Sequence, residues 1–192
     1  MVNIKICGMT NREDCLTAID LGVDFIGFVF YEESRRYVTP ESVRTIVERL
    51  DGNIKTVGVF VKETEDQIKE LMEFCKLDFA QVYNARSGPD RISVCRVSDT
   101  ILDVTEDGLV LFDNYSEGFG GSGISFDITL LKNHYALGRA FIAGGINEEN
   151  IGSIMALKPF GVDLVSSVEK YKGKKDLLKM SYLVSKIRSY EI

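Results

Sequence analysis

Residues 3–30 read NIKICGMTNREDCLTAIDLGVDFIGFVF, and this stretch indicates a parallel α/β fold. Asn3–Cys7 and Phe25–Phe30 are short, largely apolar runs of the kind found in parallel strands, which are covered on both faces. Between them, Arg12–Leu21 has the mixed apolar and polar pattern of an amphipathic helix. A strand, a helix and a second strand in this order predict a βαβ unit.

The same alternation continues along the rest of the chain. Eight strands are predicted, at Asn3–Cys7, Phe25–Phe30, Lys55–Val61, Phe79–Tyr83, Ile92–Val97, Leu109–Asp113, Ala140–Ala143 and Val162–Val165. Six helices are predicted, at Arg12–Leu21, Pro40–Leu50, Glu63–Lys76, Ile128–Leu137, Glu148–Leu157 and Lys175–Tyr190. Units of ~24 residues favour a closed (β/α)₈ barrel, the TIM barrel, formed by one domain over residues 1–192. An open doubly wound sheet is the alternative.

Local signals refine this prediction. Thr10 followed by Glu13 fits a capping box at the start of the first helix, and Pro40 suits the first position of the second. The connections 84–91 and 98–107 are too short or too rich in turn residues for a full helix. We therefore expect the helices after the fourth and fifth strands to be shortened or missing.

The composition excludes several classes of protein. Of the 192 residues 45% are hydrophobic, and 29 acidic residues against 23 basic ones give a net charge of −6. A substantial core is therefore expected, and binding to nucleic acid is not, because a phosphate backbone requires a basic face. The apolar runs are too short for a membrane span and charged residues interrupt the amino terminus, so the sequence predicts a cytoplasmic protein.

The histidine and cysteine content limits the possible chemistry. The chain has four scattered cysteines without a CxxC pair and one histidine, His134, so neither a metal site nor a disulfide framework is expected. Acid–base chemistry therefore falls on carboxylates, a thiol or tyrosine, unless His134 serves. Cys7 ends the first strand, where a barrel places its active site, and the helix that follows could lower its pKa. The other three cysteines are expected to be buried and inert.

Further candidates follow other predicted strands. Asp127 begins a helix, where its plain role is capping. Arg36 follows the second strand, and its guanidinium suits a substrate carboxylate, although it could be a solvated loop charge. Gly144-Gly145 and Ser166-Ser167 follow the seventh and eighth strands, where barrels frequently bind phosphate; simple turns and a helix cap at Asn147 are the alternative.

Residues 118–123 match the pattern GxGxxG of dinucleotide-binding proteins. That motif should directly follow the first strand of a βαβ unit, whereas here it lies deep in the chain. A nicotinamide or flavin cofactor is therefore not expected. A loop that closes over a small substrate explains the glycines better.

Taken together, these motifs resemble the phosphoribosylanthranilate isomerase family of tryptophan biosynthesis. The matching segments cover essentially the whole chain in order, at residues 5–10, 27–30, 34–38, 57–61, 120–123, 126–127, 143–147, 169 and 173–176. The resemblance implies an aldose–ketose isomerase of the intramolecular oxidoreductase class. Its reaction would be an Amadori rearrangement of phosphoribosylanthranilate to 1-(o-carboxyphenylamino)-1-deoxyribulose 5-phosphate, with no cofactor and no metal.

The resemblance also implies roles for individual residues. Cys7 would be the general base that removes the C2′ proton, and Asp127 the general acid that opens the furanose ring. Arg36 would bind the anthranilate carboxylate. Further substrate contacts are implied at Gln81, Gly121, Gly123, Gly144, Gly145, Ser166 and Ser167. The partner would be the phosphorylated sugar–anthranilate substrate, and the enzyme a monomer or a homodimer.

Two segments depart from the family pattern. Tyr83-Asn84 replaces the usual His-Gly, and Ser167 replaces a glycine. These changes motivate two alternatives: a catalytically weakened barrel that binds a phosphate ligand, and a related phosphosugar isomerase with a different amine substrate. Arg36 favours a substrate that contains a carboxylate.

Overall fold

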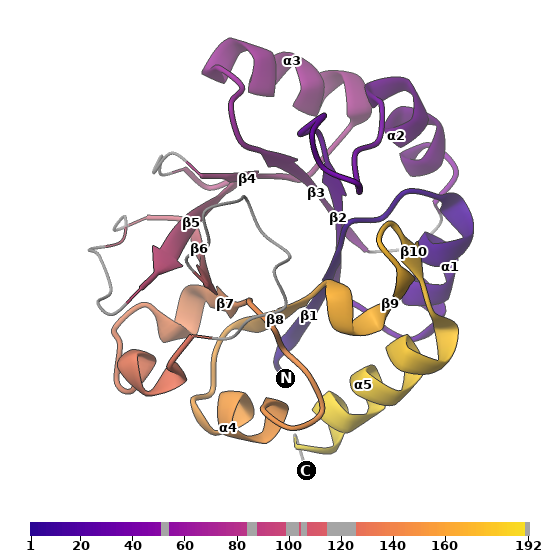
Figure 1. Ribbon diagram of the computed structural model, residues 1–192. Coiled ribbons are helices and arrows are strands. Elements are labelled where there is room, and N and C mark those ends of the chain that lie inside the picture. The colour runs from indigo at the N-terminus through magenta and orange to yellow at the C-terminus, as the bar shows by residue number, and fades with distance from the viewer. Residues whose placement is uncertain (51–53, 84–87, 99–103, 105–106, 115–125, 191–192) are drawn as a thin grey trace.

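The computed structural model describes residues 1–50, 54–83, 88–98, 104, 107–114 and 126–190. Eight parallel strands close into a barrel in chain order, because β1 pairs with both β2 and β8 (Figure 1). The strands are β1 Asn3–Cys7, β2 Phe25–Val29, β3 Lys55–Phe60, β4 Phe79–Val82, β5 Arg91–Val97, β6 Leu109–Asn114, β7 Ala140–Ile142 and β8 Gly161–Leu164. The predicted barrel is confirmed, and the open sheet is excluded.

The helices lie outside the barrel. They are α1 Arg12–Asp20, α2 Pro40–Val47, α3 Glu65–Cys75, α4 Ile151–Ala156 and α5 Leu177–Ser189. Figure 1 shows α2 beside α3 and α5 beside α1. The described residues include no helix between β4 and β5 or between β5 and β6, as the two short connections predict. None of the described helices combines the length and the apolar character needed to cross a membrane.

Two predicted helices are wrong in detail. In place of a helix over Ile128–Leu137, the chain forms two 3₁₀ turns, η1 Ile128–Leu131 and η2 Leu137–Arg139. Asn133 between them has φ 64°, a left-handed conformation that ends helices. The last helix starts at Leu177 instead of Lys175, since Lys175 belongs to a strand.

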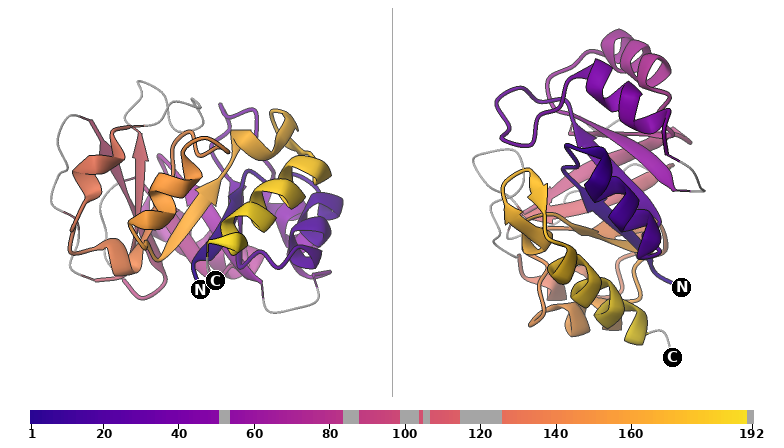
Figure 2. Two further views of the ribbon diagram at one scale, coloured as in Figure 1. Left: turned by 90° about the horizontal axis from the view of Figure 1, so that it is seen from below. Right: turned by 90° about the vertical axis from the view of Figure 1, so that its right-hand side faces the viewer.

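That strand is part of a small hairpin between β8 and α5. After the 3₁₀ turn η3 Ser166–Val168, strands β9 Glu169–Tyr171 and β10 Lys174–Lys175 pair antiparallel. The side views show the hairpin next to the carboxyl end of the barrel, with both chain termini toward the opposite end (Figure 2). The hairpin therefore lies where it can contribute side chains to an active site.

The first helix is capped differently from the prediction. Asn11, and not Thr10, is its N-cap, because Asn11 Oδ1 accepts a hydrogen bond from the backbone N–H of Asp14 at 3.0 Å. The hydroxyl of Thr10 instead donates to the carbonyl of Gly173 in the β9–β10 hairpin. The loop after β1 is thereby joined to the hairpin after β8. The predicted position of Pro40, first in α2, is confirmed.

The barrel interior is filled by aromatic rings at the amino ends of its strands. The ring of Phe25 lies 5.2 Å from that of Phe141, 5.7 Å from Phe79 and 6.4 Å from Phe160, measured between centroids. Edge-to-face packing of such rings adds to the free energy gained from their burial. The aromatic cluster fills the interior at the amino ends of the strands, which leaves the carboxyl ends for a ligand site.

Candidate active site

A cavity of about 780 Å³, open to solvent, lies at the carboxyl ends of the strands. Most of the residues predicted as site residues line it, namely Cys7, Arg36, Gln81, Gly144, Gly145, Ser166 and Ser167. Gly121 and Gly123, with the GxGxxG segment, lie outside the described residues.

Cys7 is buried at the end of β1, on the cavity wall. Its register partner in β2 is Gly27, where an added Cβ would lie 2.8 Å from Cys7 Sγ, so the glycine leaves the space that the sulfur needs. Burial raises the pKa of the Cys7 thiol, and Lys5 is the strongest opposing charge. The predicted lowering by a helix terminus is therefore wrong. A thiolate formed here is a correspondingly strong base.

Asp113, near the end of β6, is a second titratable group in the cavity. Asp113 is 9% exposed, and its Oδ1 accepts a hydrogen bond from the backbone N–H of Asn114 at 2.9 Å. Burial, followed by the negative charge of Asp163, raises the pKa of Asp113 to about 6. A carboxyl with such a pKa remains partly protonated near neutral pH and can donate a proton.

Asp127, the carboxylate assigned as the acid from the sequence, is not among the residues that line the cavity. It is exposed, and its Oδ1 accepts hydrogen bonds from the backbone N–H and the hydroxyl of Thr129, at 2.9 and 2.7 Å. These bonds lower its pKa, so the side chain is ionised at neutral pH. In this geometry Asp127 is the N-cap of η1. Capping is the structural role that the sequence allowed for this residue as the alternative to catalysis.

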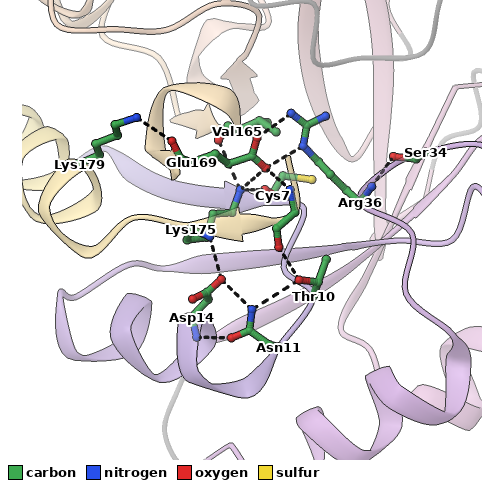
Figure 3. A network of polar contacts seen from close by, with 11 residues as sticks. Cys7, Thr10, Asn11, Asp14, Ser34, Arg36, Val165, Glu169, Lys175 and Lys179 are labelled. Carbon is green, nitrogen blue, oxygen red and sulfur yellow. Dashed lines mark hydrogen bonds and ion pairs between the residues drawn. The ribbon is translucent and has the colours of Figure 1, made fainter. Parts of the chain in front are cut away.

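Arg36 lines the cavity but is already paired (Figure 3). Its Nε and Nη2 each donate to a carboxylate oxygen of Glu169, both at 2.8 Å, and this bidentate pair is almost fully buried. The glycine at position 8 packs against the arginine stem, since a Cβ there would lie 2.6 Å from Arg36 Cδ. The guanidinium is therefore held in one orientation, with two of its three nitrogens bound to Glu169.

Lys175 connects this pair to the cysteine (Figure 3). Its Nζ donates to the carbonyl of Cys7 at 2.6 Å and to Glu169 Oε1 at 3.3 Å, and it also reaches the carbonyl of Val165 at 3.4 Å. The β9–β10 hairpin thus ties together the ends of β1 and β8 and the arginine. Lys175 lies in the family-matching segment 173–176, but the sequence alone indicated no role for it in the site.

The predicted phosphate-binding residues lie together on the β7–β8 side of the cavity. Gly144 and Gly145 have φ of 81° and 61°, which favour glycine, and they follow β7 after one intervening residue, Ala143. Ser166 and Ser167 begin η3, where the first backbone N–H groups have no acceptor within the turn. Backbone amides at both places and two hydroxyl groups are suitable donors for an anion.

Gln81 of β4 and Tyr83, the residue after β4, line the same cavity. Gln81 is 3% exposed, and its Oε1 has no hydrogen-bond partner within the described part of the chain, so this oxygen is available to a donor on a ligand. Burial and the nearby charge of Asp113 raise the pKa of Tyr83, which keeps its phenol neutral. Asn84 lies outside the described residues.

Fold and site together define a class of protein: a (β/α)₈-barrel enzyme with a thiol, a partly protonated carboxyl, a fixed guanidinium and an anion-binding end in one cavity. Comparison with known proteins agrees. The family model described as N-(5′-phosphoribosyl)anthranilate (PRA) isomerase matches residues 4–186. The chain belongs to this family.

Individual relatives support the same assignment over nearly full lengths. The chain is 36% identical to N-(5′-phosphoribosyl)anthranilate isomerase of Thermotoga maritima, over 92% of this chain and 93% of that protein. The crystal structure of the Thermus thermophilus isomerase superposes with a TM-score of 0.87 at 31% identity, covering 98% and 99% of the two chains. A phosphoribosyl anthranilate isomerase in complex with reduced 1-(o-carboxyphenylamino)-1-deoxyribulose 5-phosphate superposes at 0.79, with 28% identity, over 98% and 100%.

Proposed function

We propose that this chain is an N-(5′-phosphoribosyl)anthranilate isomerase of tryptophan biosynthesis. The observation that supports this most is that Cys7 and Asp113, on β1 and β6, line one cavity whose β7–β8 side offers backbone amides to an anion. A base and an acid from different strands can act on different atoms of a substrate placed between them. Membership of the isomerase family supports the same reaction.

In the proposed mechanism Asp113, in place of Asp127, is the general acid. The carboxyl gives its proton to the furanose ring oxygen, the C1′–O bond breaks, and the amine lone pair forms a C=N bond. The Cys7 thiolate then removes the C2′ proton, and the electron pair forms a C1′–C2′ double bond that neutralises the nitrogen. The resulting enolamine tautomerises to the aminoketose, when its hydroxyl loses a proton and C1′ gains one.

The ends of the cavity match the ends of the substrate. The 5′-phosphate would bind the amides and hydroxyls around Gly144, Gly145, Ser166 and Ser167, and Arg36 Nη1, the nitrogen that Glu169 does not bind, would meet the anthranilate carboxylate. Apolar side chains between these ends suit the aromatic ring; they include Val29, Val59, Val61, Leu111 and Ile146. Gln81 Oε1 would accept a hydrogen bond from a hydroxyl or the amine of the substrate.

The direct test is turnover of freshly made phosphoribosylanthranilate by the purified protein, followed as loss of substrate fluorescence. We expect catalysis well above the spontaneous rate. Calorimetric binding of a phosphoribosyl ligand without turnover would instead indicate the weakened binding protein, and the first reversions to test would then be Tyr83→His and Ser167→Gly. Sedimentation of the same sample distinguishes a monomer from a homodimer by mass.

Arg36→Met is expected to raise KM for phosphoribosylanthranilate by about tenfold or more, because a charge-assisted hydrogen bond to a carboxylate contributes about 1.5–3 kcal/mol. With phosphoribosylaniline, which lacks the carboxylate, the same substitution should change KM little. Arg35→Met is the matched control, since Arg35 is exposed and does not line the cavity. Equal losses with both substrates would favour an isomerase with a different amine substrate.

A further inference from the structure

An ion pair lies inside the barrel, next to the cavity. Lys5 Nζ and Asp163 Oδ1 are 3.0 Å apart, and their side chains are 0% and 4% exposed. The two residues are register partners on the neighbouring strands β1 and β8, so the backbone fixes them side by side. Asp163 lines the cavity, whereas Lys5 has no contact with solvent.

Stability alone is a weak reason for this pair. Removing two charges from water costs free energy that their attraction only partly offsets, and well-packed apolar residues are often at least as stabilising. The same interior holds an apolar cluster that includes Phe25, Val57 and Phe141. A lysine within this packing therefore suggests a function in the chemistry above it.

The geometry connects Lys5 to the cysteine. Residues two apart on a strand point to the same face, so Lys5 lies directly below Cys7 on the interior face of β1. The lysine ammonium donates a hydrogen bond to Asp163 Oδ1 at 3.0 Å and attracts the negative charge of the Cys7 thiolate. Burial opposes the charge on Lys5, but Asp163 and Cys7 together raise its pKa above the ordinary value, which keeps the lysine cationic.

Other charged or titratable groups also face the thiol, from the elements packed around β1. They are Asp163 of β8, Lys175 of β10, Tyr83 after β4 and Arg36 after β2. Lys175 binds the carbonyl of Cys7 and the carboxylate of Glu169, and Arg36 is paired with Glu169, so that one acid offsets part of the charge of both cations. Lys5 exerts the strongest attraction of a cation on the thiolate.

We propose that Lys5 is a positioning residue for the general base: its ammonium, held by Asp163, stabilises the Cys7 thiolate and fixes the direction of the sulfur. The inference rests on the proposed role of Cys7. It assigns opposite effects to the two members of the pair. Lys5 lowers the pKa of Cys7, while the carboxylate of Asp163 raises it.

The test is a titration of the Cys7 thiolate by its ultraviolet absorbance, with the Cys7→Ala protein as the blank. Lys5→Met is expected to move the Cys7 midpoint upward by at least about one pH unit, a tenfold loss of thiolate at a fixed pH. Asp163→Asn, which keeps an oxygen acceptor for the lysine, should move the midpoint downward. In turnover assays kcat/KM of Lys5→Met should fall by the same factor as the thiolate.

Shifts of the Cys7 midpoint in opposite directions would indicate an electrostatic effect, because structural damage would shift the midpoint of both variants in the same direction. Lys55→Met is the control, because Lys55 is an exposed lysine of β3 paired with Asp78 at 3.2 Å, and it should leave the Cys7 midpoint unchanged. An unchanged midpoint in Lys5→Met, or shifts of both variants in one direction, would overturn the proposal. If Lys5→Met does not fold, Asp163→Asn decides alone. The titration needs no substrate, so its outcome is independent of the proposed isomerase activity.

Discussion

Asp113→Asn is expected to reduce kcat by about 10²- to 10⁴-fold, the usual contribution of a positioned general acid, while Asp127→Asn leaves kcat nearly unchanged. The two substitutions are matched, since each replaces a carboxylate by an amide. Asp113 is buried in the cavity with its pKa raised to about 6, whereas Asp127 is exposed with its pKa lowered. Only the first can hold a proton for the ring oxygen near neutral pH.

The pH dependence provides an independent measurement. The reactive form needs a proton on Asp113 and none on Cys7, although the Cys7 pKa is the higher of the two. The population of this reactive form therefore rises with pH up to about 6, where Asp113 titrates. Above that pH the population stays constant, and it falls once the pH passes the pKa of Cys7. We expect kcat/KM of the wild type to bend near pH 6, and the residual activity of Asp113→Asn to show no such bend.

The opposite result would identify the other carboxylate. If Asp127→Asn were inactive and Asp113→Asn retained near-normal turnover, Asp127 would be the acid, as the sequence alone suggested. Thermal unfolding of both variants is the necessary control, because Asp127 caps η1 and loss of an N-cap costs about 1 kcal/mol. A small loss of stability with full activity is the pattern expected for Asp127→Asn.

The proposal of Asp113 in place of Asp127 illustrates what the sequence could and could not predict about the site. Asp113 ends a predicted apolar strand, and active-site residues of barrels lie at the ends of strands, so a signal was present. Asp127 was favoured for its place after the glycine-rich loop within a family motif, but sequence spacing does not show which way a side chain points. Burial and the raised pKa of Asp113 depend on neighbours such as Asp163, far away in the chain.

The fold itself was more predictable than the contacts around it. Strands that are covered on both faces form continuous apolar runs, so all eight strands were found with small errors at their ends. The β9–β10 hairpin was missed because its strands are short and largely polar, and its Glu169 and Lys175 are specified by tertiary contacts with Arg36 and Cys7. Buried ionic networks of this kind leave no periodic pattern in the sequence.

Cys7→Ala should reduce kcat by at least about 10²-fold with a much smaller change in KM, because it removes the base but none of the groups proposed to bind phosphate or carboxylate. Cys7→Ser tests whether acidity or space is responsible. A hydroxyl fits the same site but ionises far less readily than a thiol, so the serine protein should be as inactive as the alanine protein.

Cys75→Ala is the matched control for this prediction. Cys75 is also fully buried, but it ends α3 on the outside of the barrel, where its Sγ lies 3.4 Å from the carbonyl of Pro40. Its loss should lower the thermal unfolding temperature modestly, since a small buried group is removed, and leave kcat intact. If Cys7→Ala retained near-normal turnover, another group would have to remove the C2′ proton, and the titratable groups left in the cavity besides the proposed acid include Asp163 and Tyr83. Because Asp163 is tied to Lys5 and burial keeps Tyr83 neutral, neither is as well placed as the thiol to act as the base.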